Sequence, residues 1–249
     1  MNSDCKLFRG DCLDVLKDIE SGSVDMVLAD LPYGTTACKW DNVIPFEPLW
    51  EQLRRVAKPN AAMCMFGSEP FSSKMRMSNL KRFKYDWYLE KNRATGFLNA
   101  KRQPLYKYEL CSIFSNGKIS YNPQVRPCKP IKMKTNNTGS KSDCYGKMEW
   151  TKPTYAVRDF TYPDNRIEFK QVIKGRLHPT QKPVALLEYL IKTYTNEGDT
   201  VLDPTMGSGS TGVACKNLNR KFIGIEMDAD FFSIAKRRIE ACNLQAEFK

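Results

Sequence analysis

A short apolar strand, a glycine-rich turn and a helix follow one another in residues 200–226. The turn carries Gly207, Gly209 and Gly212 in the spacing G-x-G-x-x-G, and the strand after the helix ends at Glu226. Glycines let the backbone approach a ligand closely, and an acid on the next strand can accept hydrogen bonds from ribose hydroxyls. This order predicts a nucleoside-cofactor site in an α/β fold, and a tight turn without a ligand is the weaker interpretation.

The position of this unit in the chain indicates a circularly permuted sheet. Dinucleotide enzymes normally place such a unit first and follow it with a second βαβ half, whereas about one helix remains here after Glu226. The other strands must therefore come from the N-terminal half. Asp203 stands just before the turn and could meet an ammonium group, which favours a small zwitterionic cofactor over a dinucleotide.

A second predicted strand ends in a cluster of unlike functional groups. Residues 24–28 form a short apolar run, and Asp30-Leu31-Pro32-Tyr33 follows it directly. Asp30 offers a carboxylate, Pro32 a main-chain carbonyl at a fixed φ, and Tyr33 a flat aromatic face. Ligands bind just past the carboxyl ends of strands in open α/β sheets. The stretch therefore suits a planar molecule that carries an amino group, although an ordinary Asp-x-Pro turn has the same residues.

The remaining pattern is strands alternating with helices, as in an α/β fold. Gly10-Asp11 follows a predicted strand, and the stretch Thr35–Asp41 is long enough to act as a flap. The spacing of apolar residues predicts strands over 61–67, 85–90 and 108–114, and helices over 46–57, from Pro183 onward and around 231–239.

Residues 115–176 differ in composition from the rest. They hold 13 Lys and Arg against five Asp and Glu, which accounts for most of the net charge of +11, and seven aromatic residues are interspersed. Basic groups with interleaved aromatics suit contact with phosphates and bases, so this insert is predicted to bind nucleic acid. A flexible solvated insertion is the alternative, but the aromatic residues weigh against it.

The nine cysteines include no C-x-x-C pair, and the only histidine is His178. Free thiols in a reducing compartment are therefore expected, without a disulfide framework or a metal site. The sequence shows neither an N-terminal secretion signal nor an apolar run long enough for a membrane span, which favours a soluble cytoplasmic protein.

Three segments together resemble the amino-directed DNA methyltransferases. Asp30-Leu31-Pro32-Tyr33 is similar to their Asp-Pro-Pro-Tyr catalytic motif, with Leu31 in place of a proline. The stretch 203–211 resembles their S-adenosylmethionine motif, and 178–183 resembles the segment that precedes it. The order, catalytic motif first and cofactor motif last, is that of the permuted β type.

The resemblance implies a Rossmann-like methyltransferase domain of residues 1–114 and 177–249, interrupted by a target-recognition insert of residues 115–176. It implies S-adenosylmethionine as cofactor, DNA as partner, and methyl transfer to the exocyclic amine of a flipped adenine. Aspartate at position 30 resembles the adenine-directed members, since many cytosine-amine members carry serine there. The implied catalytic residues are Asp30, Pro32 and Tyr33. The implied cofactor-binding residues are Asp11, Asp30, Lys182, Asp203, Gly207, Gly209, Thr211 and Glu226, and His178 is expected to be structural.

Several alternatives stay open at this point. Cytosine amine or RNA could replace adenine in DNA as the substrate, and a nicotinamide-dependent oxidoreductase or a DNA-binding protein with a dead site are more remote. Pro127-Cys128 resembles the Pro-Cys nucleophile of ring-carbon cytosine methyltransferases, but no apolar strand precedes it. The sequence fits a monomer or a homodimer, and it does not reveal a recognition sequence or a companion nuclease.

Overall fold

The computed structural model describes residues 4–35, 41–135, 154–173, 175–178 and 180–246. The chain divides into two compact units, and the larger one consists of residues 1–122 and 165–249. The smaller one, which we call unit 2, spans Pro123–Asp164. The expected flap, Thr35–Asp41, lies largely outside the described residues.

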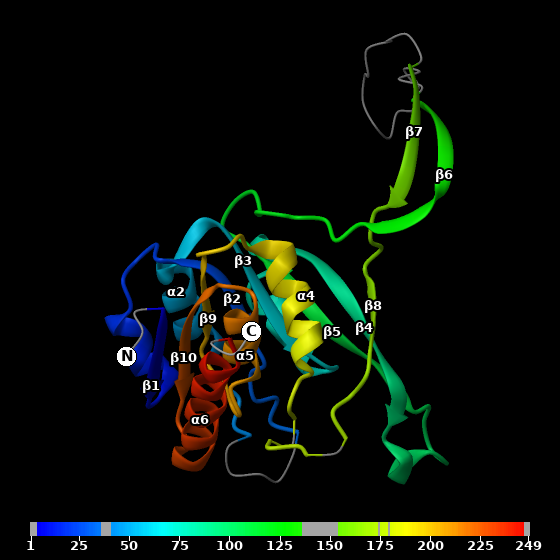
Figure 1. Ribbon diagram of the computed structural model, residues 1–249. Coiled ribbons are helices and arrows are strands. Elements are labelled where there is room, and N and C mark those ends of the chain that lie inside the picture. The colour runs from blue at the N-terminus through cyan, green and yellow to red at the C-terminus, as the bar shows by residue number, and fades with distance from the viewer. Residues whose placement is uncertain (1–3, 36–40, 136–153, 174, 179, 247–249) are drawn as a thin grey trace. The chain divides into compact units, whose positions relative to one another are not determined.

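The larger unit contains both the alternating elements that the sequence predicts and some that it does not (Figure 1). In chain order they are β1 (Cys5–Arg9), α1 (Cys12–Val15), η1 (Leu16–Asp18), β2 (Val24–Ala29), α2 (Phe46–Val56), β3 (Ala57–Gly67), α3 (Phe71–Ser78), η2 (Leu80–Arg82), β4 (Phe83–Thr95), η3 (Phe97–Asn99), β5 (Tyr106–Phe114), β8 (Arg166–Phe169), α4 (Val184–Tyr194), β9 (Thr200–Asp203), α5 (Ser210–Asn217), β10 (Lys221–Glu226) and α6 (Ala229–Ala246).

One eight-stranded sheet in the order β1-β10-β9-β2-β3-β5-β4-β8 organises this unit. All neighbouring strands are parallel except β5, which runs antiparallel to both β3 and β4. Strand β9, from the C-terminal part of the chain, pairs with β2 from the N-terminal part. The ends of β2 and β9, which carry the two predicted motifs, are therefore neighbours at one edge of the sheet.

The sheet is covered on both faces, and β2 shows why. Its residues alternate between two core clusters: Val27 and Ala29 pack with α1, α2 and α3, whereas Met26 and Leu28 pack with α4, α5 and α6. A strand buried on both faces has to be apolar throughout, which is the pattern of a parallel α/β sheet. The predicted Rossmann-like α/β architecture is confirmed.

Helix α2 illustrates how the covering helices form. Leu49, Trp50, Leu53 and Val56 repeat at helical spacing and are buried, while charged residues take the outer face. The helix α3 is not predicted from the sequence, because its segment combines few apolar residues with several polar ones.

Unit 2 consists mainly of an antiparallel pair of strands, β6 (Arg126–Thr135) and β7 (Thr154–Thr161). It is shorter than the predicted insert of residues 115–176. Strand β8 pairs with β4 in the main sheet, and Asn122 hydrogen-bonds to the end of α4. Residues 115–122 and 165–176 of the predicted insert therefore belong to the larger unit.

Candidate active site

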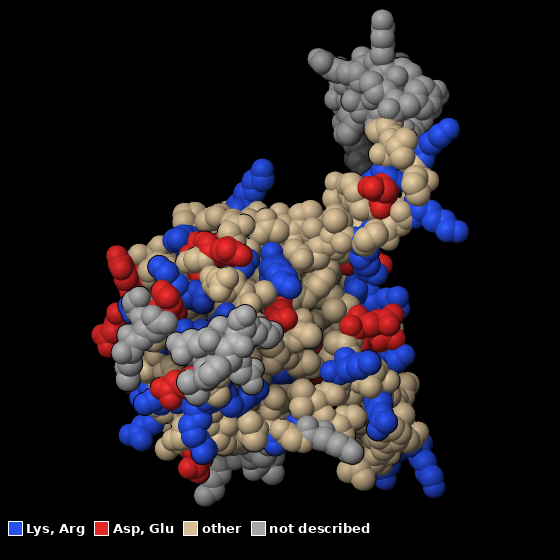
Figure 2. Space-filling model, viewed as in Figure 1, with Lys and Arg blue, Asp and Glu red and all other residues tan. Residues whose placement is uncertain are grey.

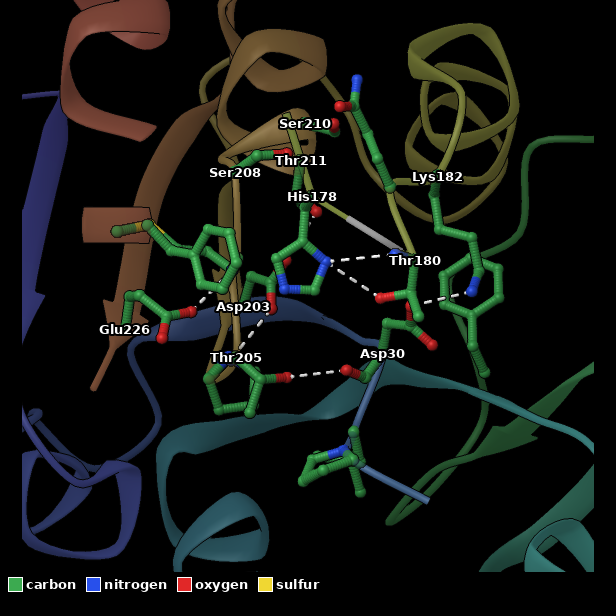
Figure 3. Close-up of a pocket in the computed structure, with 18 of the residues that line it drawn as sticks. Asp30, His178, Thr180, Lys182, Asp203, Thr205, Ser208, Ser210, Thr211 and Glu226 are labelled. Atoms are coloured by element: carbon green, nitrogen blue, oxygen red, sulfur yellow. Dashed lines mark hydrogen bonds and ion pairs between the residues drawn. The ribbon is translucent and has the colours of Figure 1, made fainter. Parts of the chain in front are cut away.

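The carboxyl ends of β2, β9 and β10 converge on one cavity of about 900 Å³. Figure 3 shows that side chains from well-separated parts of the sequence point toward one another there. Nine of the ten predicted site residues line it: Asp11, Asp30, Pro32, Tyr33, Lys182, Asp203, Gly207, Thr211 and Glu226.

Asp30 is the first residue after β2, and both of its carboxylate oxygens make polar contacts. One oxygen accepts a hydrogen bond from the Tyr33 hydroxyl (2.7 Å) and the other contacts the Lys182 ammonium (2.7 Å). Its main-chain carbonyl also accepts a hydrogen bond from the Thr205 hydroxyl (3.1 Å), which links it to the glycine turn (Figure 3). The catalytic and cofactor motifs are thus connected by direct contacts.

Leu31 departs from the usual proline, and its place in the core accounts for it. The side chain is 3% exposed and belongs to the cluster formed with α1, α2 and α3. A buried apolar side chain between Asp30 and Pro32 anchors the loop, so the polar groups on either side keep their direction.

Tyr33 is half-buried beside the cavity. Its ring stacks on Phe71, with centroids 4.8 Å apart and an angle of 28° between the ring planes. Burial and the neighbouring Asp30 carboxylate raise the pKa of the phenol, so Tyr33 is a neutral hydrogen-bond donor to Asp30.

Lys182 belongs to a chain of alternating charges that the sequence did not reveal. Its ammonium lies 2.7 Å from Asp30 and 3.5 Å from Glu109, and Glu109 lies 3.5 Å from Lys91. Burial disfavours the charge on Lys182, but attraction to Asp30 and Glu109 outweighs burial and raises the pKa. Burial likewise opposes the charge on Glu109, and Lys182 with Lys91 lowers its pKa nevertheless. The charges of the four groups cancel inside the protein.

Asp203 ends β9 and is 4% exposed. Its carboxylate accepts hydrogen bonds from the Thr205 main-chain N–H (3.1 Å) and the Thr211 hydroxyl (2.6 Å). Burial raises the pKa of Asp203 from 3.8 to about 7, although the two hydrogen bonds act in the opposite direction. In the described part of the chain, no lysine or arginine forms an ion pair with this carboxylate.

The glycine turn positions main-chain groups next to Asp203. Gly207 has a φ of +51° and donates its N–H to a Glu226 carboxylate oxygen (2.8 Å), while the other oxygen accepts the Asp228 N–H (2.9 Å). Burial raises the pKa of Glu226. Glu226 is therefore held by its neighbours at the end of β10, with its carboxylate at the cavity.

Gly209 is the one predicted cofactor residue that is absent from the cavity lining. It has a φ of +77°, and a Cβ there would lie 2.9 Å from the Ala235 side chain on α6. The residue must be glycine because of backbone conformation and close helix packing. Its contribution is to the shape of the turn.

Asp11 and His178 complete the predicted set. Asp11 caps α1 by accepting the Leu13 N–H (2.7 Å) and also lines the cavity. His178 contacts the Thr180 hydroxyl through Nδ1 (3.0 Å), and its ring centroid lies 4.2 Å from that of Phe231. Burial lowers the pKa of His178, so the imidazole is held neutral by its packing.

Lys91 and Glu109 line this site and were not predicted from the sequence. Lys91 and Glu109 lie on strands that are recognisable in sequence only by their apolar residues, and their pairing depends on the register between β4 and β5. The only sign of their role in the sequence is that they are charged residues in or directly after a predicted strand.

A family model for N6 and N4 methyltransferases, described as DNA methylase, matches residues 24–237. The chain belongs to this family. The relatives include the Type II methyltransferase M.HpaI of Haemophilus parainfluenzae, 29% identical over 96% of this chain and 75% of the relative. The Type II methyltransferase M2.DpnII of Streptococcus pneumoniae is 54% identical over 26% of this chain and 25% of the relative.

Solved structures agree with this assignment. The complex of M1.HpyAVI with SAM is 26% identical with a TM-score of 0.64, and the match covers 94% of this chain and 99% of that one. The PvuII DNA methyltransferase, named as cytosine-N4-specific, has a TM-score of 0.68 at 15% identity over 97% of this chain and 90% of that one, which shows a shared fold. The protein is an S-adenosylmethionine-dependent DNA methyltransferase.

Other features of the described residues bear on the remaining expectations. They contain no group of three or more His, Cys, Asp or Glu side chains that could hold a metal ion. None of their helices is both long and apolar enough to cross a membrane. Every described cysteine is free, and Cys128 lies on β6 of unit 2.

Proposed function

We propose that this methyltransferase acts on the exocyclic amine of adenine in DNA, with Asp30, Pro32 and Tyr33 as the residues that hold the base. The observation that carries the proposal is the direct contact between the two motifs, from the Asp30 carbonyl to the Thr205 hydroxyl, beside a single cavity. A volume of about 900 Å³ lies at the upper end of the usual range for ligand sites, so it offers room for a cofactor and a base together.

The proposed catalytic groups act by positioning. An exocyclic amine is a poor nucleophile because its lone pair is delocalised into the ring. The Asp30 carboxylate and the Pro32 carbonyl would each accept one N–H bond and direct the lone pair out of the ring plane. Asp30 already contacts Lys182 and Tyr33, one on each carboxylate oxygen, and each oxygen keeps a lone pair that can accept the incoming amine.

Asp203 lines the cavity, where its carboxylate can bind a cationic group. Asp203 is buried without a cationic partner among the described residues, and it would bind the ammonium group of S-adenosylmethionine. When bound, the cofactor supplies an electrophilic methyl group. Glu226 would hold the ribose, Asp11 would lie near the cofactor adenine, and Asp30 and Lys182 would also bind the cofactor.

The turn residues shape the rest of the cofactor site. Thr211 and Gly207 hold Asp203 and Glu226 in place through hydrogen bonds, and Gly209 lets the turn pack closely on α6. We infer that all three act on the methionine portion, Gly209 indirectly.

We further infer that the chain is a β-type member, because its catalytic motif precedes unit 2 and the cofactor motif follows it. Unit 2, with its basic strand pair, is then the target-recognition element. Adenine is favoured over cytosine because position 30 is aspartate, where many cytosine-amine members carry serine.

The test is transfer of a labelled methyl group to DNA, followed by digestion and identification of the methylated nucleoside. N6-methyladenosine in its deoxy form is the expected product. If the labelled product is N4-methyldeoxycytidine, the target base is cytosine and the assignment of adenine is wrong. If label enters RNA but not DNA, the assignment of DNA as the substrate is wrong.

A further inference from the structure

The turn between β4 and β5 exposes apolar side chains in a basic surrounding. We call residues 93–107 the β4–β5 tip. Leu98 is fully exposed and Phe97 is 69% exposed, and both lie on the short helix η3. The tip contains four basic residues and no acidic one: Arg93, Lys101, Arg102 and Lys107, of which Lys107 forms an ion pair with Glu90 on β4 (2.7 Å). Exposed apolar side chains also occur elsewhere on this surface, as at Met77 and Leu80, so the position of the tip in the fold has to show whether it is a contact site.

The tip stands next to the active-site cavity. Strand β4 runs parallel to β2 through the intervening antiparallel β5, so its end at Thr95 points to the same edge as Asp30. Lys91 and Thr95 themselves line the cavity. Figure 1 shows the β4–β5 hairpin extending beyond the body of the sheet, and Figure 2 shows basic side chains at that end.

The tip is a fixed turn. Gly96 has a φ of +89°, and a Cβ there would lie 3.0 Å from the Tyr106 ring. The Asn99 N–H bonds to the Gly96 carbonyl (3.0 Å) and the Ala100 N–H to the Phe97 carbonyl (3.1 Å). The Lys91 ammonium bonds to the Thr95 hydroxyl (3.0 Å), which joins the base of the tip to the charge chain of the active site. The apolar pair is therefore held outward before any partner binds.

We propose that Phe97 and Leu98 form a wedge that enters the DNA helix beside the base that moves into the cavity. This inference rests on the proposed function, in which the base leaves the stack to reach Asp30. Removal of a base leaves an apolar gap between its stacked neighbours, and apolar side chains that enter a base stack are an established way to stabilise distorted DNA. Lys101 and Arg102 then contact backbone phosphates on one side of the opened step, and Arg93 contacts those on the other.

Charge decides between DNA and the other occupants of such a surface. A protein partner or a second copy of this chain would bury the cations of the tip without supplying acids in a regular array. A duplex provides phosphates on both sides of the opened step, which matches apolar side chains flanked by Arg93 on one side and Lys101 with Arg102 on the other.

The test compares Phe97→Ala/Leu98→Ala with wild type on two duplexes. Both carry a site that the wild-type enzyme methylates in an expressing host, and in the second duplex the target base faces a mismatch. The mismatched base costs less to extrude. We expect single-turnover methylation of the paired duplex to fall about tenfold, and that of the mismatched duplex to stay within about twofold of wild type, because unstacking costs a few kcal/mol.

Met77→Ala/Leu80→Ala is the matched control, since both side chains are exposed (71% and 59%) on and after α3. It should keep the wild-type rate on both duplexes. The wedge variant should bind S-adenosylmethionine with wild-type affinity, which shows an intact fold. Equal losses on both duplexes, or no loss on the paired one, would overturn the wedge.

Two further results distinguish the wedge from a wrong substrate and from a contact between copies of the chain. If the DNA of a host that expresses the wild-type enzyme carries no added methyl group, the proposed function itself fails. If Phe97→Ala/Leu98→Ala converts a dimer to a monomer in light scattering, the tip is a contact between copies and the wedge is wrong. Lys101→Ala/Arg102→Ala should weaken binding to both duplexes alike and reduce the salt dependence of binding by about two phosphate contacts.

Discussion

The ends of β2 and β9 each carry a carboxylate into the same cavity, yet the protein treats the two acids differently. Asp30 faces the Lys182 ammonium at 2.7 Å, and Lys182 is balanced in turn by Glu109. Asp203 is more deeply buried and receives only the uncharged donors of Thr205 and Thr211. Burial raises the pKa of Asp203 to about 7.

This difference in surroundings indicates which kind of ligand group each carboxylate binds. A carboxylate that already holds a cation can still accept hydrogen bonds from a neutral amine. A buried carboxylate without a cation gains most from a ligand that brings a positive charge of its own. The end of β2 therefore suits the base, and the end of β9 suits the ammonium group of the cofactor.

The largest expected effect is at Asp30. Asp30→Ala removes an acceptor for the base amine, and methyl transfer should fall about 10³-fold, as for loss of a preorganised transition-state contact. Initial rates of labelled methyl transfer to DNA give the measurement. Asp14→Ala, which changes an exposed acid on α1, is the control and should leave the rate unchanged. Equal rates for wild type and Asp30→Ala would remove Asp30 from catalysis.

A smaller effect is expected at Tyr33, where two variants separate the ring from the hydroxyl. Tyr33→Ala should lower the transfer rate roughly 10- to 100-fold, because base–aromatic stacking contributes about 1–3 kcal/mol per base. Tyr33→Phe keeps the ring and loses one hydrogen bond to Asp30, so a decrease of about threefold is expected. If the two variants lose activity equally, the hydroxyl matters and the stacking assignment is wrong.

The pH dependence of cofactor binding sharpens the contrast at Asp203. Its pKa of about 7 in the free protein means that protons compete with a cationic ligand below pH 7. The Kd for S-adenosylmethionine should therefore rise about tenfold between pH 8 and pH 6. Calorimetry at both values tests this. In Asp203→Asn the Kd should be weaker and nearly constant over the range, and a wild-type Kd that is constant would contradict the role of Asp203.

The smallest effect concerns Glu226. Glu226→Gln keeps an acceptor for the Gly207 N–H but loses the charge offered to the ribose, so the Kd for S-adenosylmethionine should increase about fivefold. Comparison with S-adenosylmethionine that lacks one ribose hydroxyl provides the control, because the variant should no longer discriminate between the two ligands. Unchanged discrimination would place the ribose elsewhere.

Much of the fold could be predicted from the sequence because the central strands and the helices carry strong patterns. Each of these elements keeps one burial pattern over several residues. The strands before Asp30 and at Asp203 are apolar, and α2 has one apolar face. Strands β6, β7 and β8 have mixed polar compositions, and β8 is recognised only by its pairing with β4. Such strands are determined by contacts distant in sequence, which no local pattern shows.

The site divides in the same way. Asp30, Asp203 and Glu226 could be predicted because each follows or ends an apolar strand. The charge chain through Glu109 and Lys91 depends on strand register. No local pattern assigns a role to Leu31, and its burial in the core supplies a structural one. The acidic residues at strand ends can thus be predicted from the sequence, whereas the charged residues that pair with them are identified only in the structure.

The central claim is that Asp30 serves the base and Asp203 serves the cofactor. It is tested most directly by single-turnover methyl transfer at increasing S-adenosylmethionine concentration. Asp30→Asn and Asp203→Asn are measured in parallel at pH 8. We expect Asp30→Asn to stay slow at saturating cofactor, whereas Asp203→Asn needs more cofactor but then approaches the wild-type rate. Recovery of Asp30→Asn at saturation, or an Asp203→Asn variant that stays slow there, would contradict it.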